Sequence, residues 1–193
     1  MNIFTALLCM LPVLVPFEKD GKWGYRDGSA RVVISPRYEV AQGFTPEGIA
    51  AVVDQNGWAY IDAGGRVVIR PLVVDNGPDE FSESLARFRQ GGKVGFFDTR
   101  GKVAIPPRFS FAMPFSQGRA AVCDGCVERK EGEHLAIRRG RWGYIDSRGD
   151  LIIPQQFEQA EAFRNGRARV RLGGAWRLID MTGRPDARGV NAK

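Results

Sequence analysis

The sequence predicts an all-β protein built from tandem three-stranded β-meanders that stack as an elongated, solenoid-like array. One phrase recurs in phase along the chain, and each copy combines β-branched runs with turn residues. The copies start near residues 22, 57, 93 and 141, and a partial copy starts at 175. A single meander cannot bury its aromatic side chains, whereas stacked copies bury them against one another. A closed, propeller-like ring is the alternative, which we disfavour because four complete copies and a partial one close poorly.

An aromatic anchor opens almost every copy, and every tryptophan of the chain falls at this position. The anchors are Trp23, Trp58, Val94, Trp142 and Trp176. The interval between Val94 and Trp142 is longer than the others, so it contains an insertion, which we place at about residues 123–138. We expect the anchor tryptophans to be structural core residues rather than a cage around a ligand.

A turn follows each anchor strand. The fourth residue after the anchor is always aspartate, at Asp27, Asp62, Asp98, Asp146 and Asp180. Glycine stands three residues later in every copy except the first, which has Ala30. Aspartate accepts backbone N–H bonds at the start of a turn, and glycine adopts the left-handed conformation that closes it. Acid–base catalysis is the alternative role for these carboxylates, and their recurrence at turn corners argues against it.

The rest of each copy contains two further strands joined by an elbow. A β-branched run such as Val32–Ile34 follows the turn and ends at a proline, which cannot continue a central ladder. Aromatic residues follow the proline, and a short alternating strand such as Gly118–Val122 leads toward the next anchor. Each copy therefore contributes three strands and a proline-aromatic elbow.

These motifs resemble the WG-repeat family of bacterial β-repeat proteins, and the resemblance covers roughly Lys22 to Pro185. It implies repeated β-meanders and no general enzymatic activity. The departures from the family phrase are Arg26, Ala30, Val94 and Trp176-Arg177. They suggest edge or capping repeats rather than a different fold.

The domain prediction is a single repeat domain over residues 17–185, followed by a disordered tail over 186–193. Residues 1–16 are either a secretory signal peptide or a first buried strand, because the first 17 residues carry no charge. This apolar stretch is too short for a stable membrane span, and Pro12 and Pro16 interrupt it. We therefore expect a periplasmic or extracellular protein, with a cytoplasmic location as the alternative if the N-terminus is not a signal peptide.

The insertion contains two cysteines that flank an Asp-Gly pair. Asp124-Gly125 is typical of a two-residue hairpin turn, whose flanking residues lie within disulfide range, so we expect Cys123 and Cys126 to form a disulfide. Zinc binding with His134 as a third ligand, free thiols and a redox function are the alternatives.

Arginines give the sequence a second candidate surface. The chain carries a formal net charge of +6, spread along its length. Arg167, Arg169 and Arg171 alternate, so they line one face of a strand. The candidate binding residues are Arg138, Arg139, Arg141, Arg167, Arg169, Arg171 and His134. They would bind a polyanion, or they decorate a solvated face without a ligand.

No motif for catalysis is present. His134 is the single histidine, and neither a nucleophile elbow nor a glycine-rich phosphate loop before a helix occurs. We therefore expect no catalytic residue, no resident metal and no cofactor. The expected function is that of a non-catalytic binding or scaffold protein of the bacterial cell envelope, with a protein or an envelope polymer as partner. A polyanion binder for nucleic acid or anionic glycan is the second expectation, and a metal-binding or redox protein that uses the C-x-x-C hairpin is the third.

Overall fold

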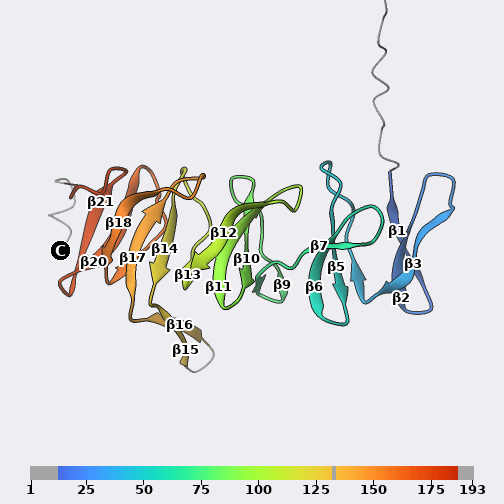
Figure 1. The fold of residues 1–193 in the computed structure, drawn as a ribbon, viewed down its shortest axis with the longest axis horizontal. Coiled ribbons are helices and arrows are strands. Elements are labelled where there is room, and N and C mark those ends of the chain that lie inside the picture. Colours follow the sequence, from blue (N-terminus) through green and yellow to red (C-terminus); the bar gives the residue numbers. More distant parts are fainter. Residues whose placement is uncertain (1–12, 132–133, 187–193) are drawn as a thin grey trace, which may run out of the picture. The chain divides into compact units, whose positions relative to one another are not determined.

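A computed structural model describes residues 13–131 and 134–186, and the described chain is all-β, with no helix (Figure 1). It divides into two compact units, Met1–Arg70 and Pro71–Lys193, and the repeated phrase occurs in both. The strands form many small antiparallel sheets, and none of the described sheets closes into a barrel. The closed ring therefore finds no support.

The first unit contains two sheets, with strand orders β1-β2-β3 and β4-β5-β6-β7 (Figure 1). The strands are β1 (Val15–Lys19), β2 (Lys22–Arg26), β3 (Val32–Tyr38), β4 (Val40–Ala41), β5 (Ala50–Asp54), β6 (Gly57–Ile61) and β7 (Val67–Ile69). In each sheet an anchor strand, β2 or β6, lies between the strand that precedes it and the β-branched strand that follows its turn. The strand types are those that the sequence predicted, but the grouping differs: β5, which ends the first predicted copy, pairs with β6 of the second, and β1 precedes the first copy altogether.

The second unit repeats the same arrangement. It contains β8 (Val73–Val74), β9 (Gly77–Pro78), β10 (Leu85–Gln90), β11 (Lys93–Asp98), β12 (Val103–Phe109), β13 (Phe111–Ala112) and β14 (Ala120–Asp124). It continues with β15 (Val127–Glu131), β16 (His134–Arg138), β17 (Arg141–Ile145), β18 (Leu151–Phe157), β19 (Gln159–Ala160), β20 (Arg167–Leu172) and β21 (Ala175–Asp180). The three main sheets have the orders β10-β11-β12, β13-β14-β17-β18 and β19-β20-β21.

The two ends of the chain differ in part from the predicted domain bounds. The boundary between residues 16 and 17 falls inside β1, which pairs with the anchor strand β2 from Val15↔Arg26 to Lys19↔Lys22. Residues 1–12 of the expected signal peptide lie outside the described residues, as does the expected tail apart from Asp186. The amide of Asp186 donates to the Leu178 carbonyl at 2.9 Å.

Recurring aromatic pairs form the core of the repeats. The aromatic residue two positions after the anchor packs edge-to-face on the last phenylalanine of the elbow, with ring centroids 4.8–4.9 Å apart. The pairs are Tyr25–Phe44, Phe96–Phe115 and Tyr144–Phe163. The Tyr25 and Tyr144 hydroxyls donate to the carbonyls of Gln42 and Glu161, both at 2.8 Å, so the buried phenols are satisfied.

The anchor tryptophans differ in burial. Trp142 is 5% exposed, and its ring lies 5.8 Å from that of Phe111. Trp23 and Trp58 are half-buried. Trp176 is 43% exposed, so the expectation of a core residue is wrong there. Trp142 pairs with Phe157 on the next strand, whereas β21 is the last strand of its sheet and has no such neighbour.

Within a unit, the turn of one repeat packs against a strand of the preceding repeat. A Cβ placed on Gly65 would lie 3.3 Å from Cγ2 of Ile34, and one on Gly149 would lie 3.1 Å from Cγ2 of Ile105. Both glycines have positive φ, at 76° and 90°. Each turn therefore rests on the isoleucine of the preceding repeat, and a side chain there would be both strained and crowded.

Two-residue turns add hydrogen bonds between repeats of the second unit. The turns are closed by reciprocal backbone bonds between residues 82 and 85, 116 and 119, and 164 and 167. Ser82 Oγ donates to the Phe115 carbonyl, and Ser116 Oγ donates to the Phe163 carbonyl, both at 2.7 Å. Neighbouring repeats are therefore joined by direct polar contacts as well as by packing.

Ala30 is the one turn-closing residue that is not glycine, and its φ is 64°. A left-handed residue with a Cβ is strained, and Ala30 is exposed, so glycine removes strain there without loss of packing. We expect Ala30→Gly to raise the free energy of unfolding by about 1 kcal/mol in urea titrations. Ser147→Gly, at an exposed turn position without positive φ, is the control and should not stabilise. Equal effects of the two changes would contradict the strain at Ala30.

Candidate functional site

The turn aspartates accept hydrogen bonds from the backbone of their own turns. In all five turns Oδ1 accepts the amides two and four residues ahead at 2.9–3.1 Å, as it does from Arg148 and Asp150 in the turn of Asp146. The pKa of Asp27 lies below its usual range, chiefly because the Ser29 hydroxyl donates to the carboxylate. The Thr182 hydroxyl lowers the pKa of Asp180 in the same way. These carboxylates are hydrogen-bond acceptors of the turns, which leaves them poorly suited to proton transfer.

The inserted residues branch out of a sheet between Asp124 and Arg141, which are paired with each other. Strand β14 pairs directly with β17, from Ala120↔Ile145 to Asp124↔Arg141, so the inserted residues are 125–140 rather than 123–138. The predicted hairpin turn at Asp124-Gly125 is wrong, because β14 does not pair with β15. The inserted hairpin instead consists of β15 and β16, with Val127 opposite Arg138 (Figure 1).

Cys123 and Cys126 lie at the base of this hairpin. Their Cα atoms are 5.9 Å apart, and the two sulfur atoms are within bonding contact. Cys123 is fully buried, while Cys126 and Ile137 pack against the hydrophobic cluster that contains Trp142. The cysteine pair therefore joins the last residues of a repeat strand to the start of the inserted hairpin.

We expect the two cysteines to be oxidised to each other in protein taken from its native compartment. Alkylation without reductant, followed by mass spectrometry, should leave Cys123 and Cys126 unmodified, and reduction under denaturing conditions should expose both. Two alkylated cysteines before reduction, or stoichiometric zinc, would reject the disulfide.

The arginines of β20 face one side, as the alternation predicts. Ala168 and Val170 are buried on the opposite side of the strand. Each arginine lies beside a carboxylate: Arg167 forms an ion pair with Asp186, Arg169 lies 3.6 Å from Glu161, and Arg171 lies 3.6 Å from Glu158. Arg169 also stacks over the ring of Trp176 at 4.8 Å. Much of the positive charge predicted for this face is therefore balanced within the protein.

Glu158 connects the two arginine groups that the sequence singled out. Arg139, Gly140, Arg141 and Glu158 line an open pocket of about 490 Å³. Since Glu158 also lies beside Arg171, the base of the insertion and the face of β20 meet at this carboxylate. Arg138 is exposed at the end of β16.

His134 begins β16, opposite Glu131, and its side chain lies outside the described residues. Among the described residues, no group of three or more His, Cys, Asp or Glu side chains is placed to hold a metal ion. The described part of the chain also holds no helix long and apolar enough to cross a membrane.

The family comparison matches the geometry of the repeats. A family model described as the WG containing repeat matches residues 23–58, 58–93, 95–125 and 142–184. The chain belongs to the WG-repeat family. The matches leave out most of the inserted hairpin, so this segment is an addition to the WG repeats. No curated protein matches the chain.

Exposed apolar pairs are a surface feature that the sequence reasoning missed. The first two residues of the β-branched strand are exposed in every WG repeat, and the third residue, an isoleucine, is buried. The pairs are Val32-Val33, Val67-Val68, Val103-Ala104 and Leu151-Ile152. Their signal in the sequence is a β-branched run without the polar alternation of a half-buried strand.

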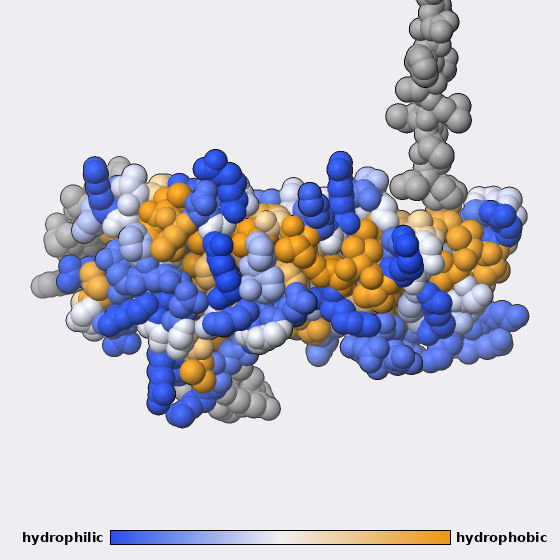
Figure 2. All heavy atoms as spheres, in the orientation of Figure 1, coloured by the Kyte–Doolittle hydropathy of each residue, from blue (hydrophilic) through white to orange (hydrophobic). Residues whose placement is uncertain are grey.

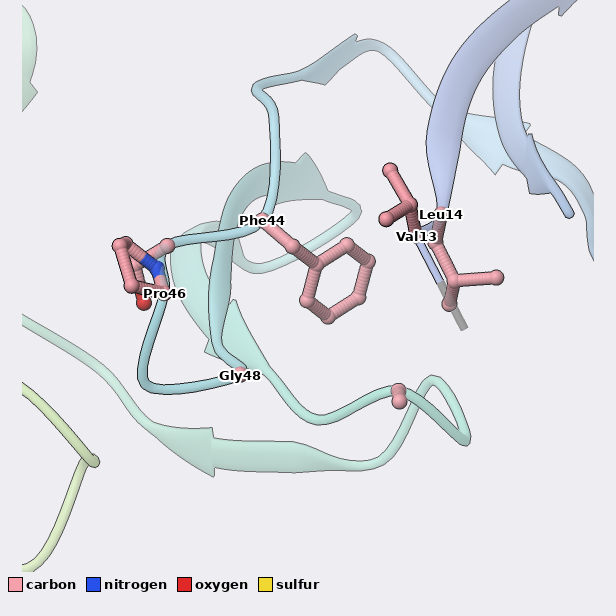
Figure 3. A pocket seen from close by; sticks show the side chains of 7 residues that line it. Val13, Leu14, Phe44, Pro46 and Gly48 are labelled. Carbon is pink, nitrogen blue, oxygen red and sulfur yellow. The ribbon is translucent and has the colours of Figure 1, made fainter. Parts of the chain in front are cut away.

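A second missed feature is an apolar pocket of about 290 Å³ in the first unit (Figure 3). It is lined mainly by Val13, Leu14, Phe44, Pro46 and Ala63, and the Phe44 ring points toward Val13 and Leu14. Ala63 follows the turn aspartate of its WG repeat, and Met181 occupies the same position in the last one. Met181 packs against the core cluster there, and Ala63 packs against the cluster that contains Leu14.

Proposed function

We propose that this WG-repeat protein is a non-catalytic binding or scaffold protein of the bacterial cell envelope, with its repeats stacked as an open, solenoid-like array. The observation that carries the proposal is the inserted hairpin, which adds surface that the WG repeats do not need. The repeated carboxylates, by contrast, accept hydrogen bonds from the amides of their own turns. Insertions of this kind often hold binding residues. The partner is a protein or an envelope polymer, and the hairpin contacts it.

A location in the envelope is supported by the close approach of Cys123 and Cys126, since disulfides persist in oxidising compartments. The uncharged first 17 residues agree with an exported protein. A cytoplasmic location is the alternative. Cell fractionation with an antibody to the protein separates the two.

The experiment that tests the binding role compares two baits on envelope extracts. The first bait is the wild-type protein, and the second carries a short Asn-Gly turn in place of residues 125–140. Because β14 and β17 pair on either side of these residues, the shortened bait should keep its β-rich spectrum and its melting behaviour. It should lose the partner that wild type retains. Recovery of the same partners by both baits would place the binding surface elsewhere.

A polyanion-binding role is a second candidate, favoured by the gathering of Arg139, Arg141 and Arg171 around Glu158. The carboxylates beside the β20 arginines count against it. Retention on heparin tests it, since polyanion binding weakens steeply as salt rises. Elution at low salt, unchanged by Arg139→Gln and Arg141→Gln, would exclude this role.

A further inference from the structure

The exposed apolar pairs recur with the same burial pattern in every WG repeat. The first residue of each pair is about half exposed, with Val32 at 50%, Val67 at 47%, Val103 at 43% and Leu151 at 49%, whereas the isoleucines that follow each pair are at most 8% exposed. The strands that carry the pairs, β3, β7, β12 and β18, each lie at the edge of a sheet. The pairs are therefore a periodic surface feature and not scattered apolar residues.

The pairs of consecutive WG repeats are neighbours within each unit. In the first unit the turn glycine Gly65 rests on Ile34, and in the second unit Gly149 rests on Ile105. Each isoleucine directly follows one pair, and each glycine stands two residues before the next pair. The face drawn in Figure 2 carries apolar surface over each unit, bordered by hydrophilic side chains. Each unit thus presents its own short row of apolar pairs.

Basic residues flank most of these pairs. Arg31, Arg66 and Lys102 directly precede a pair, and Arg148 lies in the turn before the fourth. Each of the three arginines forms an ion pair with the aspartate of its own turn at 2.8–3.3 Å, but the arginine side chains are 79–86% exposed and the aspartates only 13–27%. The exception is Asp150, which precedes Leu151 and is 67% exposed beside Arg148. The guanidinium groups are therefore the outermost charges beside these pairs, above the less exposed carboxylates of Asp27, Asp62 and Asp146.

We propose that these cation-flanked apolar rows dock the protein on the surface of an anionic lipid bilayer. Phosphate groups would meet the exposed arginines, and the apolar pairs would enter the boundary between headgroups and acyl chains. The same small unit recurs along each row instead of converging on one point. A bilayer offers the same chemistry at every point of its surface, so each repeated unit can make the same weak contact with it. These weak contacts add together without a single shaped epitope. This surface is separate from the inserted hairpin.

Co-sedimentation with vesicles tests the proposal. The full chain is mixed with vesicles of phosphatidylcholine alone or of phosphatidylcholine with phosphatidylglycerol, and we expect binding to the anionic vesicles only. The variant Val32→Thr/Val33→Thr/Val67→Thr/Val68→Thr keeps the β-branched shape and removes apolar surface, and it should bind roughly tenfold more weakly. Arg31→Gln/Arg66→Gln should weaken binding to a similar extent, roughly tenfold, and raised salt should weaken wild type.

Val73→Thr/Val74→Thr is the matched control, since these valines are 57% and 42% exposed on β8 and follow Leu72 rather than a basic residue. This variant should bind vesicles as wild type does. The protein with residues 125–140 replaced should also bind vesicles as wild type does, so the vesicle test can fail without any bearing on the proposed function of the hairpin. The proposal is overturned if wild type does not sediment with anionic vesicles. It is equally overturned if the fourfold threonine variant binds as wild type does, or if the rows prove to be needed for a protein partner and not for vesicles.

Discussion

Asp79→Ala is expected to lower the free energy of unfolding of the second unit by about 3–5 kcal/mol. Asp79 and Arg87 are 3% and 8% exposed. The Asp79 carboxylate accepts the backbone amide of Arg87 at 2.7 Å and two guanidinium N–H groups at 2.6 and 3.0 Å. Removal of the carboxylate leaves a buried guanidinium whose remaining bond is to the Ala112 carbonyl. Urea denaturation, followed by circular dichroism, measures the loss.

Two controls separate a buried charge from general damage. The double variant Asp79→Leu/Arg87→Met removes both charges and should recover most of the lost stability. Asp54→Ala breaks the ion pair with Arg70, in which the two side chains are 19% and 37% exposed, and should cost less than about 1 kcal/mol. If Asp79→Ala costs no more than Asp54→Ala, the buried pair does not hold this part of the protein together.

Trp142→Ala is the second change with a large expected effect, a loss of about 3–5 kcal/mol. The side chain is buried against Phe111 and Phe157 in the cluster that also contains Tyr144 and Phe163. Its removal leaves a cavity between neighbouring repeats, so the loss should fall on the C-terminal repeats first. Hydrogen exchange of the backbone amides in β14, β17 and β18 measures this local loss of stability.

Trp176→Ala is the matched control, because Trp176 stands at the same phase of the repeat and is 43% exposed. The guanidinium of Arg169 stacks over its ring, and removal of the ring should cost about 1 kcal/mol or less. Similar costs at the two tryptophans would show that position in the repeat, and not burial, sets their contribution.

The local features of the fold could be predicted from the sequence because short segments determine them. Aspartate and glycine at fixed spacing specify a turn wherever they occur, and the turn of Asp146 has the expected hydrogen bonds. The elbow prolines and the β-branched runs likewise mark strand ends without reference to the rest of the chain. Membership in the WG-repeat family follows from the same spacing.

Features that depend on distant partners could not be predicted. Arg87 stands where other repeats have Ala51 or Ala121, and only the fold shows that Asp79 lies beside it. Asp124-Gly125 has the composition of a hairpin turn, but the pairing of β14 with β17 takes precedence because it extends a sheet with a buried face.

The candidate site was predicted in part for the same reason. Alternation placed Arg167, Arg169 and Arg171 on one face, since the period of a strand is local. The carboxylates that balance them come from other segments, at Glu158, Glu161 and Asp186, so the net charge of the face was not predictable.

The central structural claim is that, within each unit, a WG repeat is held by the turn of the next repeat packed on its isoleucine. Hydrogen exchange of Gly149→Ala, with Gly166→Ala as control, tests it most directly. Both glycines have positive φ, but a Cβ on Gly149 meets Ile105, whereas a Cβ on Gly166 meets nothing within 4 Å. We predict that Gly149→Ala lowers protection in β12 of the preceding repeat as well as in β18, and that Gly166→Ala affects only its own turn. Loss of protection confined to the Gly149 turn, with β12 unchanged, would contradict the claim.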